Sequence, residues 1–211
     1  MFPSTADREG SVRLPVSGVL ALIGAAAVGF SILYLISDLV ELAQGGFSTA
    51  QLFLTYVAEA AIPLFVLGLY ALQRPAIGRL GLLGAIGYAY AYVFFTSTVV
   101  YALLQDTPDW SALTDQMGTW LTVHSLLIVA AGLAFGLAVV RAGVFPPWTG
   151  ALLMAGMVSL VIASFLPAVA QTAAAAVRDF AFVGMGASLL FSVPGADTAR
   201  ARRVRARSAS R

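Results

Sequence analysis

The chain has 211 residues, of which 60% are hydrophobic and only 10% are charged, whereas about 25% of the residues in a typical globular protein are charged. This composition predicts an integral membrane protein with little length left for a soluble domain. The absence of cysteine excludes disulfides, thiolate nucleophiles and iron–sulfur ligation. The absence of lysine excludes Schiff-base chemistry, and a single histidine excludes a histidine-rich zinc site. We therefore expect no cofactor and no metal.

Apolar stretches recur along the chain, each long enough to cross the ~30 Å hydrocarbon layer as a helix. They predict an all-α fold, a polytopic membrane helix bundle with six transmembrane helices. The expected domains are an N-terminal cytoplasmic segment over 1–14, a transmembrane domain over 15–194 and a basic cytoplasmic tail over 195–211. The first span follows Pro15 and is expected to be a retained helix rather than a targeting peptide. The expected spans are 16–42, 50–73, 80–104, 117–140, 147–170 and 173–193.

Arginine placement predicts the orientation of these spans. Arg74, Arg79 and Arg141 fall between spans on the same side as both chain ends, and six more arginines lie in 200–211. The positive-inside rule makes that side cytoplasmic. Both termini are then cytoplasmic, and the acidic loop around Trp110 is outside. The expected location is the cell membrane of a bacterium, with the chain as a multi-pass protein.

The lipid bilayer is the partner that this composition predicts most directly. The tail over 200–211 is expected chiefly to set topology, with binding of anionic lipid or a protein partner as the alternative. No nucleic-acid partner is expected, because the basic residues carry no interleaved aromatic residues and form no recognisable nucleic-acid module. The sequence leaves the oligomeric state open.

Glu59 is the first candidate for a functional residue, because it interrupts an otherwise uncharged run over 52–72. Ionisable groups inside a bilayer are rare and mark functional sites by default. Thr55 and Gln51 continue the face of Glu59 at helical spacing, and Tyr56 lies three residues away. Glu59 is therefore interpreted as an acid, a proton carrier or a ligand-binding group. The alternative is a structural carboxyl that is protonated or paired with Arg178.

Other spans contribute polar groups that topology places between the midplane and the outer surface. Asp38 belongs to a stripe on the first span with Ser31, Tyr34 and Glu41. His124 lies on the fourth span, and Arg178 and Asp179 lie on the sixth. Together with Glu59 these residues are candidates for one outward-leaning pocket. Each also has a structural interpretation, as a solvated helix end, a packing histidine or an interfacial ion pair.

The third span is rich in aromatic residues, among them Tyr88, Tyr92 and Phe95. Their side chains are candidates for lining a ligand cavity or for stabilising a cation through their π faces. A hydrophobic small molecule or an isoprenoid is the ligand class that such a cavity would accept. Ordinary helix packing is the alternative interpretation.

The segment Arg141-Ala-Gly-Val-Phe-Pro-Pro-Trp-Thr-Gly-Ala-Leu-Leu153, followed by Gly156, resembles the loop between the fourth and fifth helices of an uncharacterised bacterial family of small polytopic integral membrane proteins. The resemblance extends loosely across spans four to six and implies architecture without an activity. The general plan is also similar to that of small integral-membrane terpene cyclases, which use embedded acidic residues in a compact helical bundle.

Three classes of function follow from these observations, and whether the chain is an enzyme stays open. The favoured class is a non-catalytic or lipid- or ligand-binding membrane protein. The second is a proton-coupled small-molecule transporter with Glu59 as its proton site. The third is an isoprenoid (terpene) cyclase or isomerase, in which Glu59 donates the proton, Asp179 or His124 tunes or reloads it, and aromatic rings stabilise the carbocation.

Overall fold

A computed structural model describes the backbone of residues 16–208 and the side chains of residues 17–191. Over these residues the fold is entirely helical and contains no strand, as the composition predicts. Seven helices follow one another along the chain: α1 (Val16–Gln44), α2 (Thr49–Leu72), α3 (Gly78–Leu104), α4 (Trp110–Met117), α5 (Thr119–Ala142), α6 (Pro147–Ala163) and α7 (Ala168–Ser208).

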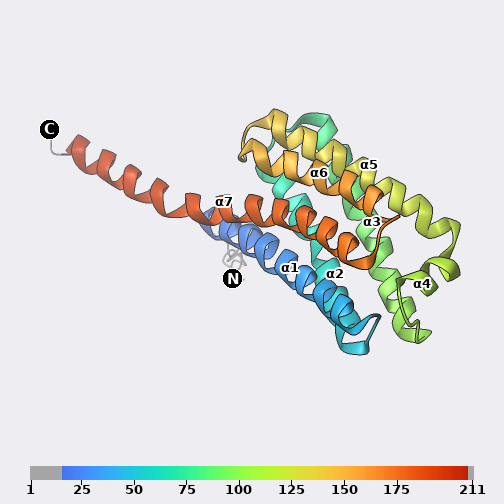
Figure 1. The fold of residues 1–211 in the computed structure, drawn as a ribbon. Coiled ribbons are helices and arrows are strands. Elements are labelled where there is room, and N and C mark those ends of the chain that lie inside the picture. Colours follow the sequence, from blue (N-terminus) through green and yellow to red (C-terminus); the bar gives the residue numbers. More distant parts are fainter. Residues whose placement is uncertain (1–15, 209–211) are drawn as a thin grey trace, which may run out of the picture.

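The longer helices form a closed ring in which each contacts its two neighbours (Figure 1). The order around the ring is α1, α2, α3, α5, α6 and α7, and α7 packs back against α1. Short connections between consecutive helices give the up-and-down arrangement of a bundle. The bundle therefore has two ends. The acidic end carries Glu41, α4 and its flanking aspartates, and the arginine end carries Arg74, Arg79 and Arg141.

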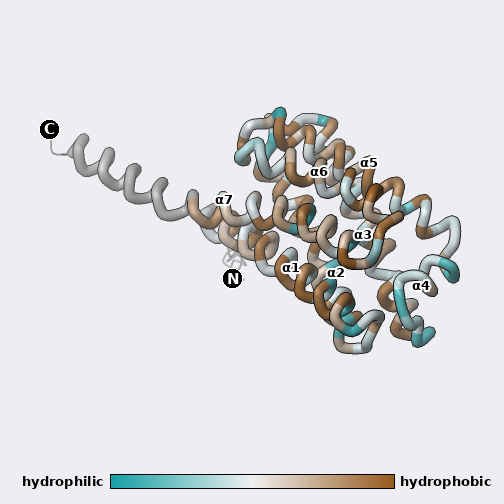
Figure 2. Tube along the Cα trace, in the orientation of Figure 1, coloured by the Kyte–Doolittle hydropathy of each residue, from teal (hydrophilic) through white to brown (hydrophobic). Residues whose placement is uncertain are grey.

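Five helices in the described part of the chain are long and apolar enough to cross a membrane. They are α1, α2, α3, α5 and the Ala168–Phe191 part of α7. Helix α6 is also apolar but has only 17 residues. Figure 2 shows hydrophobic residues along the long helices and hydrophilic residues concentrated in α4 and in the connections at the bundle ends. The length and composition of these helices are those expected of a protein embedded in a membrane.

The helix bounds differ from the predicted spans at three places. The span expected over 147–170 is too long, because α6 ends at Ala163 and α7 already begins at Ala168. The segment between α3 and α5, expected to be a loop, contains α4. Its start is capped by Asp109, whose Oδ1 accepts a hydrogen bond of 2.8 Å from the backbone N–H of Ala112. It ends at Gly118, whose φ of +52° suits glycine better than any residue with a side chain. At the other end, the predicted start of the basic tail at residue 195 lies inside α7.

Glycines bring the helices of the ring into close backbone contact. A Cβ atom at Gly84 of α3 would lie 2.5 Å from the backbone nitrogen of Phe135 on α5. One at Gly156 of α6 would lie 2.7 Å from the backbone nitrogen of Arg178 on α7. Small residues at helix contacts are a common means of packing within membranes, where the hydrophobic effect does not drive association between helices.

We expect Gly84→Ala to destabilise the protein by about 1–3 kcal/mol, because the new methyl group must separate the α3 and α5 backbones. Gly29→Ala is the matched control, since a Cβ atom there has no neighbour within 4 Å. Thermal unfolding in detergent or lipid nanodiscs measures both variants. An equal melting temperature for the two would contradict the close α3–α5 contact.

Candidate functional site

Helices α1 and α2 run antiparallel, and their polar residues face one another in register. Moving from the acidic end toward the middle of the bundle, the contacts join Glu41 to Gln51, Ser37 to Thr55 and Tyr34 to Glu59. A helical repeat of three to four residues keeps each set on one face of its helix. The two stripes therefore meet along one helix interface rather than in a wide cavity.

The part of this interface nearest the acidic end is a polar ladder made by Ser37, Glu41, Gln51 and Thr55. The side-chain amide of Gln51 is its hub, because Nε2 donates to Thr55 Oγ1 at 2.9 Å, to Ser37 Oγ at 3.2 Å and to Glu41 Oε2 at 3.3 Å. Ser37 Oγ also lies 2.5 Å from Thr55 Oγ1. Ser37 was not among the residues singled out from sequence. Its spacing from Tyr34 and Glu41 was the available signal.

One turn deeper lies a polar centre, which we define as Tyr34, Glu59, Arg178 and Asp179. The hydroxyl of Tyr34 donates a hydrogen bond of 2.7 Å to Glu59 Oε1. The guanidinium carbon of Arg178 lies 4.7 Å from the centre of the Tyr34 ring, which is cation–π geometry. Helices α1, α2 and α7 thus contribute side chains to one buried cluster.

Arg178 forms its ion pair with its neighbour in sequence and not with Glu59. Its Nε donates to Asp179 Oδ1 at 2.9 Å, and its Nη2 lies 2.9 Å from the same oxygen without hydrogen-bond geometry. Glu59 is near enough for the Arg178 charge to act on it through space, as is the half-buried Asp38. The two structural interpretations of Glu59 were a protonated carboxyl and a carboxyl paired with Arg178. The side chains do not form the second arrangement, because Arg178 pairs with Asp179.

The polar centre is shielded from solvent and lies deep in the bundle. Glu59 is 3% exposed, Arg178 6% and Asp179 3%. Glu59 lies about 15 Å along the helix axis from Thr49, the first residue of α2, at ~1.5 Å per residue. Pro63, four residues later in α2, has no backbone N–H to donate to the Glu59 carbonyl. The backbone and the side chain at this position thus both expose polar atoms in the bundle interior.

Aromatic rings of α3 cover the polar centre. The Tyr92 ring packs edge-on to Tyr34, with centroids 6.2 Å apart, and Tyr88 lies 5.1 Å from Tyr92. Tyr88 in turn packs on Phe182 of α7 at 5.6 Å. The hydroxyls of Tyr88 and Tyr92 have no hydrogen-bond partner, and neither do Glu59 Oε2 and Asp179 Oδ2. These buried atoms give the centre unused capacity to bind a proton, water or a small polar group.

The remaining sequence candidates lie around or away from the centre. Phe95 packs on Tyr92 with centroids 6.2 Å apart, so it borders the aromatic layer. Thr55 belongs to the polar ladder, whereas Tyr56 is 39% exposed. Asp38 is half-buried near the ladder. The predicted convergence thus extends to residues of α1, α2, α3 and α7.

His124 has a different environment from the one that the pocket hypothesis gave it. Its ring stacks on Phe94 at a centroid distance of 3.6 Å, and its Nδ1–H donates to the Trp120 carbonyl at 2.8 Å. Tyr90 and Trp120 complete its aromatic surroundings. These contacts come from α3 and α5 and correspond to the packing interpretation of this histidine.

Among the described residues, no three His, Cys, Asp or Glu side chains are grouped so that they could hold a metal ion. Comparison with protein-family models, curated proteins and solved structures gives no match. The resemblance drawn from the 141–153 segment therefore stays a prediction. The chemistry of the site has to be argued from its own residues.

We expect Arg178→Gln to destabilise the protein by about 3–5 kcal/mol, because it leaves the buried Asp179 carboxylate without its partner. The double variant Arg178→Gln/Asp179→Asn removes both charges and is expected to recover most of that loss. Unfolding in a denaturing detergent, followed by the fluorescence of the native tryptophans, measures both variants. A double variant as unstable as the single one would contradict the pairing.

Proposed function

We propose that this chain is a non-catalytic, multi-pass protein of the cell membrane that binds a proton at Glu59. The observation that supports it is a mismatch of charge in the polar centre. Two buried carboxyl groups, Glu59 and Asp179, share one guanidinium, and that guanidinium is ion-paired to Asp179. An unpaired carboxylate is costly away from water. A bound proton neutralises Glu59 without requiring space that the surrounding aromatic rings fill.

The hydrogen bond from Tyr34 is compatible with this role. It uses Glu59 Oε1 and leaves Oε2 without a partner, so Oε2 is the atom available to carry the proton. The polar ladder supplies a route for that proton. Thr55 lies one turn before Glu59 on α2, and Gln51 links it to the half-buried Glu41 at the acidic end. The hydroxyl and carboxyl groups of the ladder both donate and accept, as proton transfer along a chain requires, whereas the amide nitrogen of Gln51 only donates and so holds these groups in place without relaying the proton.

The transport and cyclase hypotheses remain predictions beside this proposal. A proton-coupled transporter would use the same carboxyl and the same ladder, and it would need a substrate site in addition. A terpene cyclase would need space for its substrate between Glu59 and the rings of Tyr88 and Tyr92, which in this structure pack against each other and against Tyr34 and Phe182. A hydrophobic or isoprenoid ligand therefore requires these rings to separate.

We further propose that α6 also spans the membrane, as the fifth of six spans along the chain, and that both termini lie in the cytoplasm. At ~1.5 Å per residue, the 17 residues of α6 extend about 25 Å, somewhat less than the ~30 Å hydrocarbon layer. Its position in the ring between α5 and α7 supports a spanning role. The arginines at one end of the bundle support a cytoplasmic assignment of that end.

Infrared spectroscopy of the protein in lipid tests the protonation of Glu59. We expect a protonated-carboxyl band at neutral pH that disappears in Glu59→Gln and persists in Glu41→Gln. Glutamine keeps the shape of the side chain and its acceptor for the Tyr34 hydroxyl, so loss of the band reports the acid itself. A wild-type spectrum identical to that of Glu59→Gln in this region would refute the proposal.

The protonated-carboxyl band also tests whether the proton reaches Glu59 along the polar ladder. In D2O the band of wild-type protein should shift as Glu59 exchanges its proton, and Gln51→Leu should slow that shift at least tenfold. Gln73→Leu is the matched control, because Gln73 is another buried glutamine and directly follows α2 at the arginine end. Equal exchange rates in the two variants would exclude the ladder while leaving the protonation of Glu59 intact.

Labelling of single cysteines tests the orientation, and the natural absence of cysteine makes the background clean. In intact cells, Ser111→Cys in α4 should react with a membrane-impermeant maleimide, whereas Ala76→Cys between α2 and α3 should react only after the cells are opened. Both positions are exposed at their end of the bundle. The reverse pattern would invert the proposed topology.

A further inference from the structure

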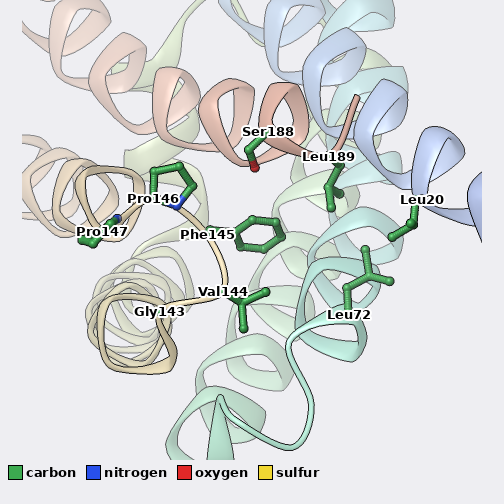
Figure 3. A pocket seen from close by; sticks show the side chains of 9 residues that line it. All are labelled: Leu20, Leu72, Gly143, Val144, Phe145, Pro146, Pro147, Ser188 and Leu189. Carbon is green, nitrogen blue, oxygen red and sulfur yellow. The ribbon is translucent and has the colours of Figure 1, made fainter. Parts of the chain in front are cut away.

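The connection between α5 and α6 builds a cavity at the arginine end of the bundle. Helix α5 ends at Gly143, whose φ of +63° reverses the chain, and Pro147 begins α6. The residues between them are directed toward α1, α2 and α7, where they help to line an open cavity of about 570 Å³ (Figure 3). Ligand sites in proteins commonly measure ~300–1,000 Å³. This cavity is remote in register from the polar centre, because its α2 wall is Leu72 and not Glu59.

The walls of the cavity are mostly, though not entirely, hydrocarbon. Figure 3 shows Phe145 projecting into the space opposite Leu20 of α1 and Leu72 of α2. Leu189 of α7 lies above them in the same view. The hydroxyl of Ser188 donates to the Met185 carbonyl at 2.7 Å, so it is already engaged within its own helix. A ligand in this cavity is therefore held by apolar contact.

Positively charged residues lie close in sequence to the residues that line the cavity. Arg74 follows Leu72 by two residues, and Arg141 precedes Gly143 by two, and both side chains are exposed. Arg79 is at the same level as Arg141, because the antiparallel contact of α3 and α5 joins Gly84 to Phe135 and Gly87 to Ala131. Among residues 17–191, the aspartates and glutamates lie toward the acidic end or in the bundle interior. No carboxylate of residues 17–191 forms an ion pair with Arg74, Arg79 or Arg141.

We propose that this cavity binds one anionic phospholipid of the membrane, with an acyl chain against Phe145, Leu20 and Leu72 and the phosphate at Arg74 and Arg141. A mostly apolar cavity near arginines that form no ion pair with any carboxylate of residues 17–191 matches both parts of such a molecule. Arginine suits the phosphate because its planar guanidinium donates two parallel hydrogen bonds. The exposed Val144 and Pro147 place the cavity at the surface of the bundle, where a lipid has access. The site does not depend on proton binding at Glu59.

Lipid titration of the full chain in nanodiscs tests the site. The protein is placed in phosphatidylcholine bilayers, and phosphatidylglycerol with the same acyl chains is added while retained lipid is counted by native mass spectrometry. We expect one phosphatidylglycerol to be retained with at least tenfold preference over phosphatidylcholine. Equal retention of the two lipids would overturn the proposal, and so would equally tight binding of soluble glycerol phosphate, which would indicate an anion site without a chain pocket.

Two variants separate the parts of the site. Arg74→Gln/Arg141→Gln should reduce the preference for phosphatidylglycerol by about fivefold per arginine, the factor that corresponds to roughly 1 kcal/mol each. Val144→Trp should reduce retention of both lipids, because the indole occupies the cavity from a position that is 51% exposed and tolerant of substitution. Asp115→Asn at the acidic end is the control and should change neither. Melting temperatures in pure phosphatidylcholine must match wild type, and unchanged lipid retention in both variants would refute the site.

Discussion

The burial of Arg178 is the constraint on which the arrangement of α1, α2 and α7 depends. A guanidinium inside a helical bundle has no water to replace its hydration, so the surrounding helices must supply charge, acceptors and π faces. Asp179 supplies the charge, and the Tyr34 ring supplies the π face. Gly156 allows the α6 backbone to approach at the same level. Tyr34 in turn links α1 to α2, because its hydroxyl donates a hydrogen bond to Glu59.

The α1–α2 interface changes character along its length for the same reason. Toward the acidic end, Ser37, Gln51 and Thr55 hydrogen-bond to one another, and these bonds fix the register of the two helices. Toward the arginine end the same interface is apolar, with Ala27 and Val66 fully buried. A shift of one helix by a single turn would mismatch these polar pairs and would leave the polar group at one end of the stripe against hydrocarbon. The polar half therefore specifies the arrangement, and the apolar half supplies contact area.

Hydropathy and charge placement were sufficient to predict the helices, because a membrane span must satisfy its backbone internally and must be apolar for its whole length. Hydropathy did not predict helix α4, because this helix is short and polar and depends on the local cap at Asp109. The stripe of Gln51, Thr55 and Glu59 was also visible in the sequence. What spacing within one helix does not reveal is the partner on another helix. The pairing of Arg178 with Asp179, the bond from Tyr34 to Glu59 and the stacking of His124 on Phe94 all depend on how the helices rotate against each other.

One half of the bundle contains the buried polar centre and the other contains the mostly apolar cavity. A tight contact between α1 and α7 joins the two halves. Between the polar centre and the cavity at the arginine end, Gly24 of α1 meets Gly186 of α7 so closely that a Cβ atom at Gly24 would lie 2.9 Å from the Gly186 carbonyl oxygen. Such a contact resists sliding, because close-packed helices move between discrete arrangements and do not deform continuously. A change at Glu59 that leaves this contact intact does not move Leu20 relative to Leu189. Helix α2, however, carries both Glu59 and Leu72, so it connects the polar centre to the wall of the cavity directly. Coupling of protonation to lipid binding would therefore run along α2, or it would require α1 and α7 to separate at Gly24 and Gly186.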